Sequence, residues 1–348
     1  MAAGMATEAA GKPRRIRNIS ELAKLAGVSA GTVSRALAGK DLVNTQTRER
    51  IQALAREHGF RPNQMASRLR TGQTGVIGLV IPLGDDRRQR LCDPFVMTLL
   101  GHLADTLAER GYDILLSRAN AAHREDWLDR IVDSGMIDGV LMIGQSDQFE
   151  TIERVAEGYL PLVVWGAHRE GQAHCAVGTD SLAGGKLAAA HLLAGGRRKL
   201  ALFGDPAGGS GNRQQLAGAE AAVTAAGGGS WIEAFPVLAG AQDIAGQIAA
   251  SLDRMDPATD GIVAASDAIA MATLRLLHER GRKVPQDMAL VGFDDLPMAA
   301  QTVPQLTTVR QDIAGGAQAM VASLLKRIAG EAAPSTVMEP QLVVRESA

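Results

Sequence analysis

The spacing of apolar residues changes character along the chain. Between residues 19 and 59, apolar positions recur at helical spacing in three short segments: ISELAKLA at 19–26, the segment after Ser29, and TRERIQALAREHG at 47–59. Gly27 follows the first segment, Gly59 ends the third, and Asn44 or Thr45 can cap the third. A helix, a tight turn containing glycine and a second capped helix predict a helix-turn-helix.

The second of these helices has two distinct faces. At 100° per residue, one face is apolar and consists of Val33, Ala36 and Leu37, and the other consists of Gly31, Ser34, Arg35 and Ala38. The second face is small apart from Arg35, which suits insertion into a major groove with the arginine on a guanine edge. Glycine costs a helix roughly 1 kcal/mol relative to alanine, so we interpret Gly31 as a position where a side chain would separate backbone from DNA. The alternative is a plain three-helix packing module.

The segment FRPNQMASRLRTGQTG at 60–75 predicts a short hinge helix over 63–70 and a flexible linker. A helix this short is marginal alone in water, so it requires a partner. Residues 1–17 form a lead-in of small and then basic residues without the core of a signal peptide, which predicts a disordered segment in a cytoplasmic protein. No stretch has the 18 or more apolar residues of a membrane span.

From residue 76 onward, buried-strand patterns alternate with amphipathic helical patterns. Strands are predicted within 76–83, 112–117, 137–144, 160–166, 199–204, 261–266 and 288–295. Helices are predicted within 95–111, 124–135, 150–158, 181–196, 213–227, 244–255 and 268–281. Repeated βα units predict doubly wound parallel sheets, and this length favours two α/β lobes. Ligands bind at the carboxyl ends of such strands, in loops that start at Pro82, Ser117, Gly144, Trp165, Gly204, Ser266 and Phe293.

The charge is unevenly distributed between the two parts. Residues 1–72 contain thirteen Lys and Arg against five Asp and Glu, whereas the remaining residues contain 23 against 33. A basic head on an acidic body indicates a polyanionic partner for the head, although a merely solvated basic surface is the alternative. The two cysteines, Cys92 and Cys175, form no disulfide framework and are expected to be reduced.

Signatures of catalysis are absent from the sequence. No G-x-G-x-x-G follows the first α/β strand, and GTDSLAGGK at 178–186 fails as a phosphate loop because Leu187 replaces the required hydroxyl residue. The histidines have no metal-ligand spacing. Asp267, Asp294 and Asp295 at strand ends are expected to bind hydroxyls or amines. The sequence therefore predicts neither an enzyme nor a cofactor or metal.

From about residue 18 the chain resembles the LacI/GalR family of bacterial transcription regulators. The resemblance rests on ISELAKLAGVSAGTVSRAL, TRERI, FRPNQMASRLRTGQTGVIGLVIP, ALVGFDD and PQLTTV. It implies a DNA-binding head at 18–60, a hinge at 61–75 and a two-lobed core at 76–348 shaped like periplasmic sugar-binding proteins. The implied crossings between lobes fall near 176–181, 304–308 and 331–336. Lobe 1 is then about 76–177 and 306–332, and lobe 2 about 178–305 and 333–348.

The resemblance also assigns roles in DNA binding. Ala30 and Gly31 occupy variable base-reading positions, and Arg35 occupies that of the common base-reading arginine. Leu69 matches the leucine that is inserted into the minor groove, which costs unstacking energy offset by contacts to the bent duplex. The positions implied for phosphate contacts or for anchoring the hinge are Asn18, Ser29, Thr32, Ser34 and Asn63.

For the effector cleft, the resemblance implies Phe95 as an aromatic contact and Asp294 as an acceptor for ligand hydroxyls. Trp165 stands at a strand end and could stack on a sugar ring or remain a core residue, and Ser266 stands where sugar-binding members often have Asn. Many members read Arg-x-x-Gly-aromatic within the cleft. This chain has Gln215 and Ala219 at those positions and an arginine at Arg213 instead, which leaves the sugar unidentified.

The function implied is that of a homodimeric repressor on a pseudopalindromic operator, with a small effector bound between the lobes. The favoured class of effector is a sugar. A purine- or nucleoside-responsive repressor is the alternative within the family. A pure ligand-binding protein is the alternative outside it, and the basic head argues against that. The C-terminal part of the sequence contains no heptad repeat of the kind that would indicate a tetramer.

Overall fold

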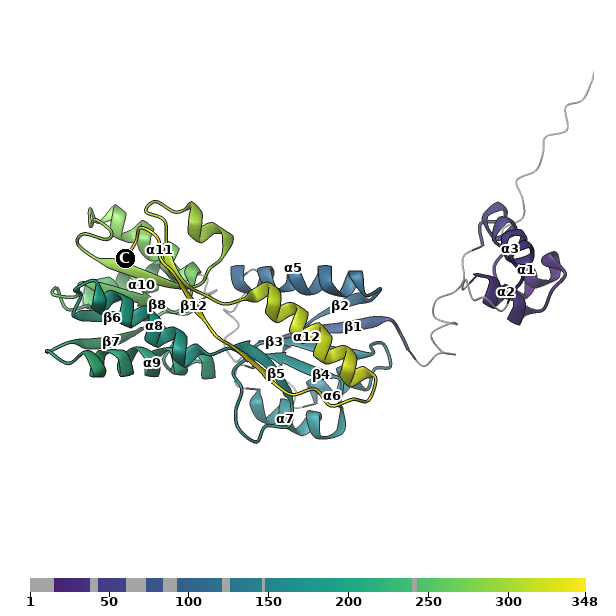
Figure 1. Cartoon of the computed structure of the whole chain (residues 1–348), viewed down its shortest axis with the longest axis horizontal. Helices are drawn as coiled ribbons and strands as arrows, with labels where there is room; N and C mark the ends of the chain where they lie inside the picture. The colour runs from purple at the N-terminus through teal and green to yellow at the C-terminus, as the bar shows by residue number, and fades with distance from the viewer. Residues whose placement is uncertain are drawn as a thin grey trace, which may run out of the picture. The chain divides into compact units, whose positions relative to one another are not determined.

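A computed structural model of the chain describes residues 16–37, 43–60, 73–83, 93–120, 126–145, 148–239 and 243–348 (Figure 1). The chain divides into two compact units, Met1–Thr74 and Gly75–Ala348. The expected hinge helix, with Asn63 and Leu69, lies outside the described residues, as do Cys92 and almost all of the lead-in.

The head contains the three helices that the sequence predicts: α1 (Ile19–Ala26), α2 (Ala30–Leu37) and α3 (Thr45–Glu57). Asn18 caps α1, because its Oδ1 accepts the backbone N–H of Glu21 at 2.9 Å and its Nδ2 donates to the Glu21 carboxylate at 3.0 Å. Gly27 takes the left-handed conformation that ends α1, and Asn44 caps α3. The helices share one small core, made of Leu22, Ala23, Ala26, Val33, Ala36, Val43, Ile51, Ala55 and Phe60.

Lobe 1 of the core is a parallel sheet in the order β11-β5-β4-β3-β1-β2. Its strands are β1 (Val76–Leu83), β2 (Asp113–Asn120), β3 (Gly139–Ile143), β4 (Leu162–Trp165), β5 (Cys175–Thr179) and β11 (Thr336–Met338). One face packs against α5 (Pro94–Glu109) and α12 (Ile313–Ile328). The other packs against α6 (Trp127–Val132) and α7 (Phe149–Gly158), so both faces of the sheet are covered.

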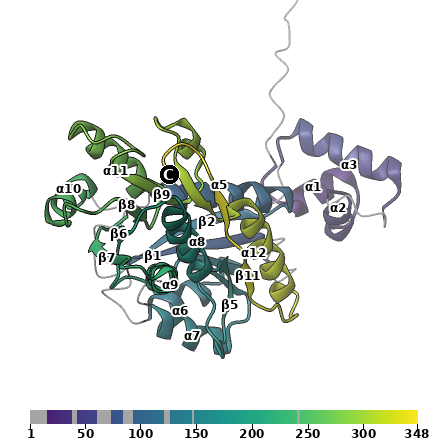
Figure 2. The same ribbon diagram turned by 60° about the vertical axis from the view of Figure 1, so that its left-hand side comes forward.

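Lobe 2 contains a second sheet, in the order β12-β10-β9-β8-β6-β7. Figure 2 labels its strands β6, β7, β8 and β9 and the helices around them. Its strands are β6 (Lys199–Gly204), β7 (Trp231–Pro236), β8 (Gly261–Ala264), β9 (Ala289–Asp294), β10 (Thr307–Arg310) and β12 (Gln341–Val343), the last antiparallel to β10. Helices α8 (Ser181–Ala194) and α9 (Ser210–Ala226) cover one face, and α10 (Ile244–Arg254) and α11 (Asp267–Glu279) the other. A 3₁₀ helix, η2 (Pro297–Gln301), follows β9.

The chain crosses between the two sheets at three places. The first crossing lies between β5 and α8, within the expected range of 176–181. The second lies between β10 and α12, and the third between β11 and β12. Both come later than the expected ranges of 304–308 and 331–336, so the expected lobe boundaries there are wrong. Strand pairing is the reason: β10 pairs with β9 in lobe 2, and β11 pairs with β5 in lobe 1.

Helices α8 and α9 approach each other unusually closely because of two glycines. A Cβ on Gly218 would collide with the backbone oxygen of Leu182, and one on Gly185 would collide with that of Gln215. At the start of the two helices, Ser181 of α8 lies against Gly211 of α9, beside the cavity described below. No helix in the described part of the chain is long and apolar enough to cross a membrane.

Candidate functional site

The exposed face of α2 matches the face that helical periodicity predicts. Ala30, Gly31 and Arg35 are exposed, while Val33 and Ala36 are buried in the core of the head. At the start of the helix, Ser29 Oγ accepts the N–H of Thr32 at 3.1 Å and lies 2.9 Å from its hydroxyl; Ser34 is half-buried. Helix α2 therefore presents an exposed face of small residues on which Arg35 is the one long side chain.

Gly31 and Arg35 are neighbours on this surface. The Nε of Arg35 donates to the carbonyl oxygen of Gly31 at 3.1 Å. A Cβ on Gly31 would lie 3.6 Å from Arg35 Nη2, an ordinary van der Waals distance. Packing within the head therefore does not require glycine at position 31. A need for glycine there would have to come from a partner that contacts this surface. Asn18 already pairs both polar side-chain atoms with Glu21, and an expected phosphate contact there competes with helix capping.

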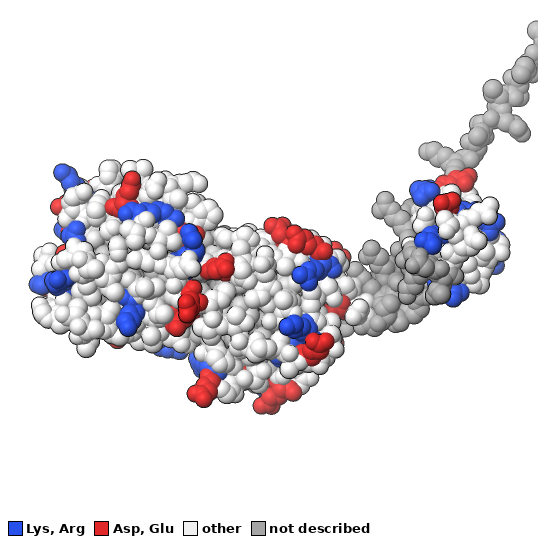
Figure 3. Space-filling view, viewed as in Figure 1, with Lys and Arg blue, Asp and Glu red and all other residues white. Residues whose placement is uncertain are grey.

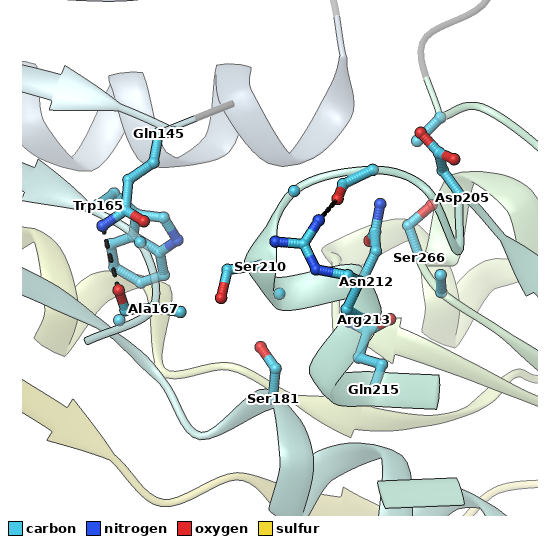
Figure 4. A pocket seen from close by; sticks show the side chains of 18 of the residues that line it. Gln145, Trp165, Ala167, Ser181, Asp205, Ser210, Asn212, Arg213, Gln215 and Ser266 are labelled. Atoms are coloured by element: carbon cyan, nitrogen blue, oxygen red, sulfur yellow. Dashed lines mark hydrogen bonds between the residues drawn. The ribbon is translucent and has the colours of Figure 1, made fainter. Parts of the chain in front are cut away.

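A cavity of about 760 Å³ lies between the lobes of the core, at the carboxyl ends of strands from both sheets (Figure 4). The six residues predicted for the effector cleft all line it: Phe95, Trp165, Arg213, Gln215, Ser266 and Asp294. The cavity therefore lies at the edge of both sheets where the rule for parallel strands predicts ligand binding.

The aromatic wall of the cavity comes from lobe 1. The rings of Phe95 and Trp165 are tilted against each other with centroids 5.6 Å apart. Trp165 is only 6% exposed, and its ring packs so closely over α12 that a Cβ on Gly316 would collide with it. Trp165 is thus mainly a core residue, with little ring surface left for stacking on a ligand.

Asp294 ends β9 and is 4% exposed. Its Oδ1 accepts a hydrogen bond from Gln311 Nε2 at 2.7 Å, and its Oδ2 accepts one from the backbone N–H of Asp267 at 3.4 Å. Burial, together with the nearby Asp267 carboxyl, raises the pKa of Asp294 well above its usual range. A protonated Asp294 can donate to a ligand as well as accept from it.

Asp267 lies beneath Asp294 and is fully buried. It accepts hydrogen bonds from Thr308 Oγ1 at 2.6 Å and from the N–H of Leu296 at 2.8 Å. Burial raises its pKa to about 7 in spite of these donors. Together the two carboxyl groups form a buried pair in which burial raises both pKa values.

Lobe 2 contributes a polar wall from the start of α9 and from α11. Arg213 is exposed and donates from Nη1 to the carbonyl oxygen of Gly208, whereas Gln215 is 7% exposed and buried against α8. Ser266 caps α11 by accepting the N–H of Ile269 at 3.3 Å. The displaced arginine of this sequence therefore reaches the cavity, and Gln215 reaches it too.

Several cavity residues were not anticipated individually: Asp93, Gln145, Arg169, Ser181, Ser210 and Asn212. Gln145 donates from Nε2 to the carbonyl oxygen of Ala167 and to His174 Nε2, both at 3.1 Å, which leaves its Oε1 as an acceptor at the cavity (Figure 4). Gln145 and Arg169 belong to loops that start at predicted strand ends, and Ser210 and Asn212 lie in the first turn of α9, which follows such a loop, so the sequence predicts the segments but not the orientation of these side chains.

A helix-turn-helix head joined to a two-lobed core with a polar cavity at its strand ends defines the architecture of a DNA-binding regulator. Residues 18–63 match the family described as bacterial regulatory proteins, lacI family, and residues 189–348 match the periplasmic binding protein-like domain. The HTH-type transcriptional regulator CelR of Thermobifida fusca is 31% identical over 96% of this chain and 99% of its own. The chain therefore belongs to the lacI family and is a transcriptional regulator.

Solved structures give the same result. A transcriptional regulator CelR–cellobiose complex is 29% identical, with a TM-score of 0.66 over 96% of this chain and 100% of that one. A lac repressor dimer bound to operator and the anti-inducer ONPF has a TM-score of 0.80 over 96% and 99%. At 21% identity, the second likeness shows the fold alone.

Proposed function

We propose that this regulator is a homodimeric repressor whose affinity for a pseudopalindromic operator changes when a sugar or sugar derivative binds between the lobes. The observation that carries the proposal is the cavity, because residues of both lobes line it. A ligand that contacts both lobes favours one arrangement of them over another, and it can shift the fraction of the protein that is competent to bind DNA.

The cavity is also connected to the crossings between lobes. Gln311 lies in the second crossing, and it donates from its side chain to Asp294 at 2.7 Å and from its backbone N–H to the Asp294 carbonyl at 3.3 Å. The first and third crossings are joined by a hydrogen bond of 2.9 Å from the N–H of Asp180 to the oxygen of Met338. A ligand group at Asp294 therefore acts on a residue that links the lobes.

The polar lining favours a ligand rich in hydroxyl groups. Gln145 offers a hydrogen-bond acceptor from lobe 1, and Gln215 offers a side-chain amide from lobe 2. Asp294 offers a carboxyl group that can donate a hydrogen bond as well as accept one. Relatives support this choice: a CelR structure contains cellobiose, and a ribose operon repressor of Halalkalibacterium halodurans is 27% identical over 94% of this chain. Trp165 is 6% exposed and therefore offers little ring surface on which a purine could stack.

The test uses the full-length protein and an operator selected from random duplexes. Operator affinity is measured with sugars, sugar derivatives and purines, and a promoter–reporter fusion distinguishes repression from activation. Asp294→Ala is expected to keep operator binding and lose the ligand effect, whereas Asp253→Ala, on the exposed side of α10, is expected to keep both. Ligand binding to the core without any change in operator affinity would contradict the proposal.

A further inference from the structure

We infer that the ligand of the core carries an oxyanion, a phosphate or a carboxylate, bound at the first turn of α9. The inference rests on the proposed function, because it specifies the ligand class of the same cavity. It starts from the segment DPAGGSGNR at 205–213, which comprises the loop after β6 and the first residues of α9 and borders the cavity.

Helix α9 begins with backbone donors that nothing in the described structure satisfies. Its N-cap is Gly209, which has no side chain to accept a hydrogen bond, and no acidic residue lies in its first turn. The N–H groups of Ser210, Gly211 and Asn212 find no acceptor among the described residues. Side chains cap three other helices that start at the cavity, since Asp93 caps α5, Asp180 caps α8 and Ser266 caps α11, whereas α7, like α9, has no side-chain cap. Free N–H groups at the positive end of a 17-residue helix attract an anion.

A second, independent observation concerns buried polar side chains beside this turn. Ser181 is 9% exposed and Gln215 is 7% exposed, and neither side chain has a hydrogen-bond partner among the described residues. Ser181 Oγ lies 3.4 Å from where a Cβ of Gly211 would stand, so it lies directly against the first turn of α9. Figure 4 shows the hydroxyls of Ser181 and Ser210 facing each other across the cavity. The polar ends of both side chains remain accessible from the cavity, so they are available to a ligand group bound there.

Two arginines at the cavity are available to an anion. Arg213 uses Nη1 to bind the Gly208 oxygen, and it forms no ion pair with a described carboxylate. From lobe 1, Arg169 lies 4.0 Å above the ring of Phe149 and likewise has no described carboxylate partner. Two uncompensated guanidinium groups therefore line the cavity from opposite lobes.

Four carboxyl groups also line the cavity, and they do not occupy this subsite. Asp294 has a strongly raised pKa because of burial, and Asp93 is buried at the cap of α5 with a pKa that burial also raises. Asp205 accepts the N–H of Ala207 at 3.1 Å, and Figure 4 shows it on the far side of the loop from Ser181 and Ser210. Glu150 is exposed on α7 in lobe 1.

The donor set distinguishes an oxyanion from a neutral hydroxyl. Three backbone N–H groups, two serine hydroxyls and a guanidinium can all donate, and a group with two or three acceptor oxygens satisfies several of them together. A sugar hydroxyl would satisfy one or two and leave the other donors to water. The remaining lining, with Gln145 and Asp294, would bind the hydroxyl groups of the same ligand.

The experiment measures binding of inorganic phosphate to the full-length protein by isothermal titration, with total ionic strength held constant by chloride. We expect saturable binding that Arg213→Gln weakens about tenfold or more, as expected when a charge-assisted hydrogen bond is lost. Ser181→Ala should weaken it severalfold. Arg254→Gln is the matched control, since Arg254 is an exposed arginine of α10 that also binds a backbone oxygen but lies outside the cavity. Arg35→Ala is the control for the head: this variant should bind phosphate with the same affinity as the wild type if the phosphate site lies in the core.

Glucose, gluconate and glucose 6-phosphate then identify the source of the anion. Tighter binding of gluconate than of glucose indicates a sugar acid, and tighter binding of glucose 6-phosphate indicates a sugar phosphate, in each case only if Arg213→Gln removes the advantage. No saturable phosphate binding, or equal binding by Arg213→Gln, would overturn the inference. If neutral sugars alone change operator affinity, this inference fails and the proposed function stands. If phosphate binds at α9 but no ligand changes operator affinity, the proposed function fails instead.

Discussion

Arg35 is the long side chain on an exposed surface that otherwise consists of Ala30, Gly31 and the partly buried Ser34. If it reads a guanine edge, Arg35→Ala should cost about 1–3 kcal/mol at one operator base pair and relax the preference there. The measurement is operator affinity against a set of duplexes with single base-pair changes. Equal weakening on every duplex would show that Arg35 contacts phosphate alone.

The buried carboxyl pair gives a prediction about pH. The pKa of Asp267 is about 7 in the folded protein and near 3.8 when unfolded, so the folded state binds the proton more tightly. Its contribution to stability is therefore greatest at low pH and is lost as the pH rises from about 4 through 7. Asp294, with its pKa raised in the same direction, adds to this loss.

Asp267→Asn removes one titrating group of the pair, so it should flatten the dependence of melting temperature on pH between 5 and 8, whatever it does to absolute stability. The control is Asp253→Asn, because Asp253 has a 66% exposed side chain. Parallel curves for the wild type and Asp267→Asn would show that the carboxyl does not change its protonation in this range.

At the scale of elements, the sequence predicts the longer units well. Helices α5 and α11 and strands β1 and β9 have strong periodicity or continuous apolar runs, and each lies close to its predicted range. The predicted set lacks helix α12 and five short strands. These strands are three to six residues long: β5, β7, β10, β11 and β12. Helix α12 contains Gly315 and Gly316, which weaken a helical pattern, although Gly316 is needed for close contact with Trp165. Tertiary contacts, which no local pattern contains, decide such elements.

The cavity shows the same division between local pattern and tertiary contact. Strand ends predict which loops line it, because all parallel strands of one sheet end at the same edge. They do not predict that Trp165 turns into the core or that Ser181 reaches across to α9, since both depend on packing between elements distant in sequence. The placement of Asp294 on the cavity follows from its strand end, whereas its pairing with Asp267 does not.

The contact between α8 and α9 reverses a rule of helix propensity. An alanine in place of glycine normally stabilises a helix interior by up to about 1 kcal/mol. Gly218→Ala should instead lower the free energy of unfolding by about 1–3 kcal/mol, because its Cβ would collide with the backbone oxygen of Leu182. Gly101→Ala in α5 is the matched control, because no atom lies within 4 Å of its added Cβ, and it should stabilise the protein. Denaturant unfolding measures both, and stabilisation by Gly218→Ala would show that the helices can separate at little cost.

At the scale of the whole molecule, the two compact units differ in charge and therefore in their expected partners. Residues 1–72 contain thirteen basic and five acidic residues, and the rest of the chain contains 23 and 33. Figure 3 shows acidic side chains distributed among the basic ones on the visible face of the core, without a continuous basic surface. A polyanion is thus attracted by the head, while the field of the core repels it.

A fragment of residues 75–348 should therefore fold and show no salt-dependent retention on duplex DNA. The full-length protein, in contrast, should bind its operator with an affinity that falls by orders of magnitude between 50 and 200 mM salt, because each phosphate contact releases counterions. Both are measured on one immobilised operator over the same salt series, with melting curves to show that the fragment is folded. The fragment keeps the cavity, so it should still bind the core ligand at an affinity close to that of the full chain. Tight, salt-sensitive binding of DNA by the folded fragment would mean that the core contributes a second nucleic-acid surface, and the assignment of DNA binding to the head alone would be wrong.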